Sequence, residues 1–322
     1  MVKNKFMSQL FESFTNSSPP LKWPGRKTKL LKPIKLAFQS AACKPEVYIE
    51  PFVGSGAVFL MLKNTGLIKK AFLNDYLKEL EIFYKTLKNR SNLNNLEIGF
   101  KKHIKLYNAR NSNEEKKDFY NKKRETYNTL LSSIENLNKE EKIELSALLL
   151  FLNKSCFNGV YRKNNKGQFN VPHGRRVGLS QNLKFDLNDS QHLLNLSKLF
   201  NNTKITSGDF SKSLVNVNHN DFVFIDPPYV ENFVGYSEKG FDDSKNIELS
   251  QTINQLKERN INFLMSNSNT EKTKEIFFNS RLYCYELEVT RTIERRKNDR
   301  SGRTTEILVS SYKIDALGES IW

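Results

Sequence analysis

The sequence has few cysteines and histidines and no long apolar run, and these shortages exclude several kinds of protein. Its three cysteines, Cys43, Cys156 and Cys284, lie far apart along 322 residues, so a disulfide framework is not expected. We therefore expect the protein to be located in a reducing cytoplasm. The four histidines are scattered, so no metal site is predicted. Apolar runs such as Leu148–Leu152 are much too short to span a bilayer, and the N-terminus lacks the apolar region of a signal peptide. We therefore expect a soluble protein that has no membrane partner.

Acidic residues are also scarce relative to basic ones, which gives a net charge of +16 and a pI of about 9.5. The excess is local, because residues 86–195 carry 20 Lys and Arg against 11 Asp and Glu. Residues 291–303 carry another six basic residues against two acidic ones. Clustered positive charge is typical of a surface that binds nucleic acid, whereas solvated helix faces explain the total more easily than the clustering.

The chain begins with the pattern of a doubly wound α/β sheet. A strand over 47–50 precedes a glycine loop, Pro51–Gly56, and an apolar helix that starts at Ala57–Leu62. A second strand, Ala71–Leu73, ends in Asn74 and Asp75, and further strands are predicted around 204–205, 222–225, 263–265 and 306–311.

The segment 86–155 is helical in pattern, with capping boxes at Ser112/Glu115 and Asn138/Glu141. A basic loop region rich in Gly and Asn follows it over 156–185. We predict a cofactor domain over 21–85 and 196–315 that is interrupted by a mainly helical domain over 86–195. Tails are expected over 1–20 and 316–322.

The glycine loop favours a cofactor other than a dinucleotide or a nucleoside triphosphate. Gly54 and Gly56 allow a tight turn and a close approach to a ligand, and Asp75 lies about where an acidic residue meets ribose hydroxyls. The third glycine of a dinucleotide fingerprint is replaced by Phe59, and no Gly-Lys-Ser/Thr sequence is present. Since Glu50 places a negative charge beside the glycines, S-adenosylmethionine fits better than a pyrophosphate. A lone Gly-x-Gly is weak support by itself.

The residues Asp226-Pro227-Pro228-Tyr229 follow a buried strand and indicate chemistry on an amino group. The Asp226 carboxylate and the Pro227 carbonyl can accept both hydrogens of an exocyclic amine, which favours the tetrahedral nitrogen that attacks a methyl group. The same acceptors stabilise positive charge that develops on that nitrogen. The Tyr229 ring can stack on an extruded base. A strand that simply ends in a proline turn is the structural alternative.

Other chemistries lack their residues. Methylation of a cytosine ring carbon needs a cysteine nucleophile, usually after proline, and no cysteine follows a proline here. The paired carboxylates of a glycosidase and the His/Cys ligands of a zinc deaminase have no candidates either.

Taken in order, these motifs resemble those of the Dam-type DNA adenine-N6 methyltransferases, a group that includes GATC-specific enzymes of restriction–modification systems. The resemblance covers roughly residues 21–312. Its motifs are Leu21–Lys27, Glu50–Gly56, Asn74-Asp75, Phe157–Arg162, Gln168–Gly174 and Asp226–Tyr229. The group usually reads Lys-Trp-x-Gly-Gly-Lys in the first motif, from which Pro24 and Arg26 depart slightly.

The resemblance implies a seven-stranded Rossmann-like sheet that binds S-adenosylmethionine, with Asp226–Tyr229 as the catalytic motif. It also implies that the segment Ser207–Phe210 encloses the adenine of the cofactor. The implied cofactor contacts are Trp23, Lys27, Glu50, Pro51, Phe52, Gly54, Ser55, Gly56, Asp75, Asp209, Phe210 and Asp226.

The inserted domain resembles the target-recognition domain of the group, so double-stranded DNA is the implied partner. The implied DNA contacts are Lys22, Phe157, Asn158, Val160, Arg162, Asn170, Pro172, Arg175 and Arg176. By this resemblance Lys22 and Arg162 each read a guanine, while Val160 and Pro172 suit a thymine methyl group. Together these contacts are compatible with GATC.

Phe157 and Asn158 match positions that wedge into the duplex beside a flipped adenine, and Arg175 and Arg176 suit phosphates. A basic residue read without the resemblance is more often a phosphate contact or a solvated charge. The segment 291–303 fits a solvated hairpin loop and a phosphate clamp equally well. A strand that starts at Phe263 runs into a polar turn, Ser266–Ser268, near the predicted site.

We predict a DNA adenine-N6 methyltransferase. Protection against a cognate restriction endonuclease, as a functional rather than a physical partner, and marking of DNA for regulation are both compatible with the sequence. Two alternatives stay open at this point. One is an RNA or protein amino-methyltransferase of the same fold, although such enzymes more often carry Asn in place of Asp226. The other is a DNA-binding relative without catalytic activity.

Overall fold

The computed structural model describes residues 18–25, 27–41, 44–174, 182–185, 187–229, 241–290 and 303–322. Predictions for residues 1–17, for Arg175 and Arg176, and for most of the 291–303 segment lie outside these ranges. The chain divides into two compact units. The first unit comprises Met1–Arg26, Gly54–Thr65 and Asp75–Gly208, and the second comprises Lys27–Val53, Gly66–Asn74 and Asp209–Trp322.

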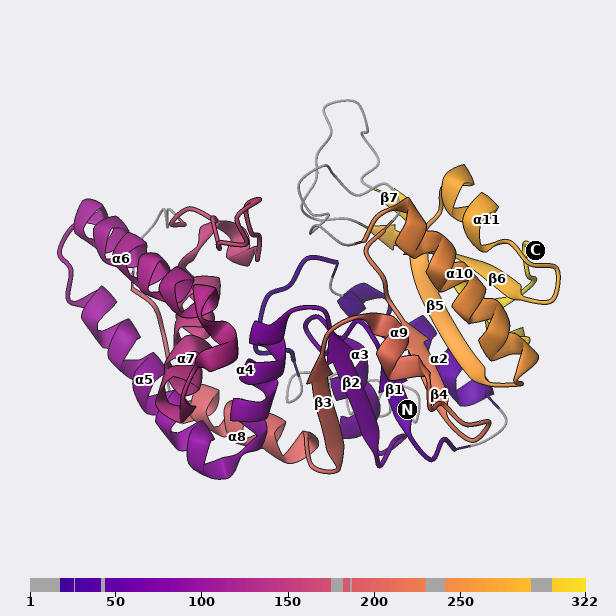
Figure 1. Ribbon diagram of the computed structural model, residues 1–322, viewed down its shortest axis with the longest axis horizontal. Helices are drawn as coiled ribbons and strands as arrows, with labels where there is room; N and C mark the ends of the chain where they lie inside the picture. The colour runs from indigo at the N-terminus through magenta and orange to yellow at the C-terminus, as the bar shows by residue number, and fades with distance from the viewer. Residues whose placement is uncertain are drawn as a thin grey trace, which may run out of the picture. The chain divides into compact units, whose positions relative to one another are not determined.

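The strands form a seven-stranded sheet in the order β3-β2-β1-β4-β5-β7-β6 (Figure 1). Their bounds are β1 Tyr48–Glu50, β2 Ala71–Asp75, β3 Thr203–Ser207, β4 Phe222–Ile225, β5 Asn262–Ser268, β6 Tyr283–Thr290 and β7 Arg303–Ser310. Strand β1 runs parallel to β2 and β4, and β4 runs parallel to β5. Strand β7 is antiparallel to β5 and β6. The predicted doubly wound α/β sheet with seven strands is confirmed.

The order of the strands reverses beside β1, which places a topological switch point between β1 and β4. Ligands of doubly wound sheets bind beyond the carboxyl ends of the strands at such a point. Glu50 is the last residue of β1, and Asp226 follows β4 directly. The fold therefore brings two of the predicted motifs to the edge where a ligand is expected.

In the second unit, helices cover both faces of the sheet. They are η1 Lys27–Lys29, α2 Leu31–Ser40, α9 Phe210–Leu214, α10 Asp243–Glu258, α11 Glu271–Phe277 and η4 Asp315–Leu317. Alternating residues of the strands, such as Val223 and Ile225, pack with Leu249 of α10 in one apolar core. On the opposite face the Phe38 ring of α2 packs against Tyr48 and Phe222. The buried core thus holds the carboxyl ends of β1, β4 and β5 in place.

The first unit is mainly helical (Figure 1). Its helices are α3 Ala57–Asn64, α4 Lys78–Lys88, α5 Arg90–Asn108, α6 Asn113–Ser132, η2 Ile134–Asn136, α7 Lys139–Ser155, η3 Phe157–Gly159 and α8 Leu187–Leu199. Helix α7, which buries the apolar run Leu148–Leu152, packs against α4, α5 and α6. Both predicted capping boxes are confirmed, because Ser112 and Glu115 exchange hydrogen bonds at the start of α6 and Asn138 and Glu141 do so at α7. The domain bounds predicted from the sequence stay a prediction.

Within the described ranges, no helix is both long enough and apolar enough to cross a membrane.

Candidate active site

In the second unit, Asp226 lies directly after β4 and has two polar partners. Lys27 Nζ lies 2.8 Å from Asp226 Oδ1, and the Ser266 hydroxyl donates to the same oxygen at 2.9 Å. The Asp226 side chain is 20% exposed, whereas Lys27 is 5% exposed. Burial raises the pKa of Asp226 above its usual value, although Lys27 and Ser266 oppose the rise by stabilising the charged form. A carboxylate with a buried cation on one oxygen can still meet a ligand through its exposed part.

Tyr229 is oriented by groups from two other segments of the second unit. Its hydroxyl donates a hydrogen bond to Glu306 on β7. Lys27 Nζ lies over its ring, 4.6 Å from the centroid. The hydrogen bond restrains the hydroxyl end of the ring and the cation–π contact restrains one of its faces. Tyr229 is therefore held beside Asp226 in a defined orientation. Pro227 between them is buried and Pro228 is exposed.

Glu50 at the end of β1 and the residues after it as far as Val53 are also part of the second unit. Glu50 is 2% exposed and accepts a hydrogen bond from the Tyr48 hydroxyl at 2.7 Å. The Asn74 amide donates to the Pro51 carbonyl at 3.2 Å. The Phe52 ring stacks on Phe210 with 5.4 Å between centroids. Of the predicted cofactor residues, Phe52 and Phe210 are therefore brought together by the fold.

Asp209 caps α9 by accepting from the Ser211 backbone N–H at 3.0 Å and forms an ion pair with Lys245 at 2.7 Å. Burial would raise its pKa, but the hydrogen bonds from Lys245 and Ser211 outweigh that effect and hold the pKa below its usual value. The carboxylate of Asp209 thus has a clear structural role. Its predicted contact with a cofactor stays a prediction.

In the first unit, the glycine loop is bound to Asp75. The Gly54 N–H donates to Asp75 Oδ2 at 2.8 Å, and the Leu77 N–H donates to Oδ1 at 3.1 Å. Burial raises the pKa of Asp75 to about 6, with a further rise from the charge of Glu79, while the two N–H donors and Lys163 oppose it. The residue as a whole is half-buried. Burial therefore weakens the preference of Asp75 for its charged form.

Gly54 occupies a position where a side chain would fit poorly. Its backbone φ is +46°, and a Cβ built on it would lie 3.0 Å from Cδ1 of Trp23. Gly56, with φ at +70°, begins α3 in the left-handed conformation, and Ser55 between the two glycines is buried. The predicted cofactor residues Trp23, Gly54 and Asp75 are thus neighbours in the first unit.

The predicted DNA contacts come largely from two antiparallel segments of the first unit. Isolated bridges pair Cys156 with His173 and Lys163 with Phe169. The Phe157 N–H donates to the Pro172 carbonyl at 2.9 Å, and Arg162 Nε donates to Asn170 Oδ1 at 2.9 Å. The exposed predicted residues are Phe157, Asn158, Arg162 and Pro172, while Val160 and Asn170 are half-buried. We name residues 156–163 and 168–174 the recognition pair.

Lys22, which is distant in the sequence, lies against the recognition pair. Asn153 accepts from the Lys22 N–H at 2.9 Å and donates to the Lys22 carbonyl at 2.8 Å and the Gly159 carbonyl at 3.0 Å. Gly159 has a φ of +66°, and a Cβ there would collide with the Lys22 side chain. The fold thus brings together the two residues predicted to read guanines, Lys22 and Arg162, on one small part of the first unit.

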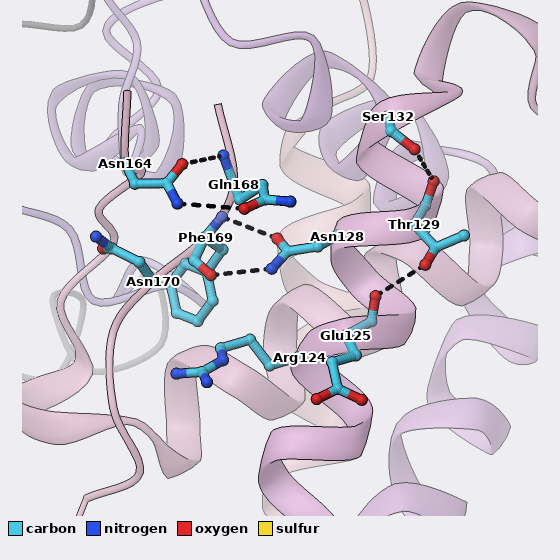
Figure 2. Close-up of a pocket in the computed structure, with 9 residues that line it drawn as sticks. All are labelled: Arg124, Glu125, Asn128, Thr129, Ser132, Asn164, Gln168, Phe169 and Asn170. Carbon is cyan, nitrogen blue, oxygen red and sulfur yellow. Dashed lines mark hydrogen bonds between the residues drawn. The ribbon is translucent and has the colours of Figure 1, made fainter. Parts of the chain in front are cut away.

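An open pocket of about 510 Å³ lies between α6 and the recognition pair (Figure 2). The amide of Asn128 accepts from the Phe169 N–H at 2.8 Å and donates to the Phe169 carbonyl at 3.1 Å, as a neighbouring strand would (Figure 2). The Tyr120 hydroxyl and Arg124 donate to the Val171 carbonyl. Side chains of helix α6 therefore support the second segment of the recognition pair by hydrogen bonds to the backbone of that segment.

Several contacting residues are not predicted from the sequence. Ser266 and Glu306 contact Asp226 and Tyr229, and only Ser266 belongs to a segment expected near the site. In the first unit, Glu79 accepts a hydrogen bond from Tyr161. The only sequence signal for Tyr161 is its place between Val160 and Arg162.

Comparison with known proteins yields a consistent group of relatives. A family model described as "D12 class N6 adenine-specific DNA methyltransferase" matches residues 23–293. The type II methyltransferase M.MjaIII of Methanocaldococcus jannaschii is 33% identical over 310 residues, which cover 91% of this chain and 99% of that protein. The type II methyltransferase M1.LlaDCHI of Lactococcus lactis subsp. cremoris is 31% identical, with 95% and 99% covered. The DNA adenine methylase of Escherichia coli K12 is 26% identical, with 91% and 94% covered.

Proposed function

Because this chain belongs to the D12 class N6 adenine-specific DNA methyltransferase family, we propose that it methylates an adenine flipped out of duplex DNA within GATC, with S-adenosylmethionine as methyl donor. The chain is an adenine-specific DNA methyltransferase and acts on DNA. The donor, the flipping of the base and the recognition sequence are the proposed parts. The observation that supports them best is the Asp226 carboxylate at the end of β4, partly exposed, beside Tyr229.

Asp226 is proposed to accept a hydrogen bond from the N6 amino group of adenine. Lys27 and Ser266 both contact Oδ1, so the acceptor is proposed to be Oδ2. The Pro227 carbonyl accepts the second hydrogen. Two acceptors on the amine localise its lone pair on nitrogen and stabilise the positive charge that develops there during transfer. Lys27 lies over one face of the Tyr229 ring, and adenine is proposed to stack on the other.

The residues of the first unit fit the cofactor by their own chemistry. S-adenosylmethionine, when bound, supplies an electrophilic methyl group on a sulfonium. Asp75, a half-buried residue, carries a carboxylate that can accept from ribose hydroxyls, and the missing Cβ of Gly54 lets the Trp23 ring lie close against the glycine loop. In the second unit, the buried Glu50 adds a negative charge that suits a cationic ligand. These residues are proposed to bind the donor.

The proposed readout of GATC uses Lys22 and Arg162 for the guanines and Val160 and Pro172 for the thymine methyl group. Phe157, which is 55% exposed, is proposed to fill the space left by the flipped adenine, together with Asn158. Since two relatives are named type II methyltransferases, we also propose that methylation by this chain protects DNA from an endonuclease with the same recognition site.

The test is methyl transfer from S-adenosylmethionine to duplexes that carry GATC or one of its single-base variants, with nucleosides identified by mass spectrometry. We expect N6-methyladenine in the GATC duplex and rates at least tenfold lower on the variants. Product on no duplex would refute the proposed reaction. Equal rates on all duplexes would leave the reaction standing and refute the readout by Lys22 and Arg162.

A further inference from the structure

Glu79 of the first unit is a buried carboxylate that the proposed chemistry does not use. It lies on α4, is 2% exposed, and has two partners at 2.5 Å, the hydroxyl of Tyr161 and Nζ of Lys163. A carboxylate is unfavourable in the interior unless it is paired and hydrogen-bonded, as Glu79 is. Both partners belong to one short segment of the recognition pair, so Glu79 fixes that segment to α4.

The residue between the two partners is Arg162. Side chains of an extended segment alternate between its two sides, so Tyr161 and Lys163 share the side that meets Glu79. Tyr161 is 5% exposed, whereas Arg162 is exposed. On the outer side, Arg162 Nε donates to Asn170 Oδ1 at 2.9 Å, and the Asn170 N–H donates to the Arg162 carbonyl at 3.1 Å. The orientation of Arg162 therefore depends on two sets of contacts. Tyr161 and Lys163 contact Glu79 on one side, and Arg162 itself contacts Asn170 on the other.

The Tyr161 ring is confined on several sides. Trp23 stacks on it with 4.7 Å between centroids and 17° between planes, and Phe169 lies 5.3 Å away. The Tyr127 hydroxyl lies 3.2 Å from the Tyr161 hydroxyl. Burial, reinforced by the charge of Glu79, raises the pKa of Tyr161 well above its usual range, so the hydroxyl keeps its proton as a donor. Because the ring is packed on these sides, its contact with Glu79 helps to set the position of the backbone at residue 161.

We infer that Glu79 and Tyr161 are positioning residues that determine specificity, because they hold the segment 161–163 so that Arg162 meets its base in one orientation. The inference rests on the proposed function, in which Arg162 reads a guanine. A bidentate contact with a guanine requires a defined plane and distance, and a supporting group that is about 1 Å out of place weakens it. Glu79 thus acts on recognition through Arg162, without a contact to DNA of its own.

The test compares base discrimination in Arg162→Ala, Glu79→Gln and Tyr161→Phe, measured as kcat/KM on the preferred duplex divided by kcat/KM on each single-base variant. Arg162→Ala identifies the base pair that Arg162 reads, where discrimination should fall about 10- to 100-fold. Glu79→Gln and Tyr161→Phe should lower discrimination at the same base pair by about three- to tenfold and leave the other positions unchanged.

The matched control is Glu97→Gln. Glu97 lies on α5 of the same unit and forms an ion pair with Lys101 at 2.6 Å, and it accepts a hydrogen bond from the Ser190 hydroxyl at 2.6 Å; neither partner belongs to the recognition pair. This variant should keep the discrimination of the wild type at every position.

Three results bear on the inference. A drop in discrimination confined to the Arg162 position supports it. A uniform loss of rate on all duplexes, or a change at another base pair, overturns it and leaves Glu79 with a structural role only. If Glu79→Gln does not fold, Tyr161→Phe decides alone, because it removes one hydroxyl and keeps the ring stacked on Trp23. A wild type that methylates no duplex would instead refute the proposed function.

Discussion

Two carboxylates, one in each compact unit, each lie beside a lysine and a hydroxyl group, yet they differ in exposure. In the second unit, Asp226 pairs with Lys27 and Ser266 and keeps 20% of its side chain exposed. In the first unit, Glu79 is 2% exposed. Its partners, Lys163 and Tyr161, are the two sequence neighbours of Arg162.

The difference teaches how a carboxylate that meets a substrate can be distinguished from one that positions other residues. Both carboxylates require compensation for the loss of water, and both receive it. The partners of Asp226 contact one oxygen and leave part of the side chain accessible. The aspartate and the glutamate each form an ion pair with a lysine, so accessible surface is the feature that separates their proposed roles.

The largest expected effect comes from removing the accessible carboxylate. Asp226→Ala should lower the single-turnover rate of methyl transfer by about 10³-fold or more, because it removes an acceptor aimed at charge that develops on the adenine nitrogen. Glu79→Gln should keep this rate within about tenfold of the wild type. Both rates are measured at saturating DNA and S-adenosylmethionine, with circular dichroism to confirm folding. Turnover of Asp226→Ala within tenfold of the wild type would place the reaction elsewhere.

The next effect separates the two lysines. Lys27→Met should lower the free energy of unfolding by about 3 kcal/mol at neutral pH, because it leaves Asp226 without its buried cation. It should also raise the pKa of Asp226 further, since Lys27 is the main group that lowers it, and so move the acid limb of the kcat profile to higher pH. Lys163→Met should leave that limb in place, because Lys163 pairs with Glu79.

The pH dependence of stability in Lys27→Met follows from the same shift. A carboxyl group whose pKa is raised on folding binds more protons in the folded state, so its ionisation lowers stability as pH rises through the folded pKa. The loss caused by Lys27→Met should therefore be largest above the raised pKa of Asp226 and should shrink as pH falls. Urea unfolding at pH 7.5 and pH 5 measures it. A loss equal at both values would mean that Lys27 stabilises the fold by packing alone.

Much of the fold is predictable because its signals are local. The strand before the glycine loop, the apolar start of α3 and the strand before Asp226 are each read from a few consecutive residues. The capping boxes at Ser112 and Asn138 follow from spacings of three residues, and both are present. Such patterns depend on backbone geometry within one turn or one strand, so the rest of the chain does not obscure them.

The partners that set the chemistry are not predictable in this way. Tyr161 and Glu79 are 82 residues apart, Tyr229 and Glu306 are 77 apart, and Ser266 and Asp226 are 40 apart. Each pair consists of common residue types with no characteristic spacing. Only the folded chain brings these residues together. Only their burial in the folded protein shows that Glu79 is inaccessible and that Asp226 is partly exposed.

The smallest effect concerns a third carboxylate, Asp75, whose pKa burial raises to about 6. If ionised Asp75 accepts from ribose hydroxyls, S-adenosylmethionine should bind about fourfold more weakly at pH 5.5 than at pH 7, since protonation of the free protein competes with binding. Calorimetric titration measures the affinity, and Asp75→Asn should remove the pH dependence. The charge of Glu79 helps to raise the pKa of Asp75, so Glu79→Gln should move the weakening to lower pH, and Lys163→Met should move it to higher pH. Opposite shifts in these two variants would show that the charge of Glu79 affects Asp75 in the cofactor loop. Glu79 would then act on the cofactor loop through its charge and on recognition through its contacts. An affinity that is the same at pH 5.5 and pH 7 in the wild type would exclude Asp75 as an ionised acceptor for the cofactor.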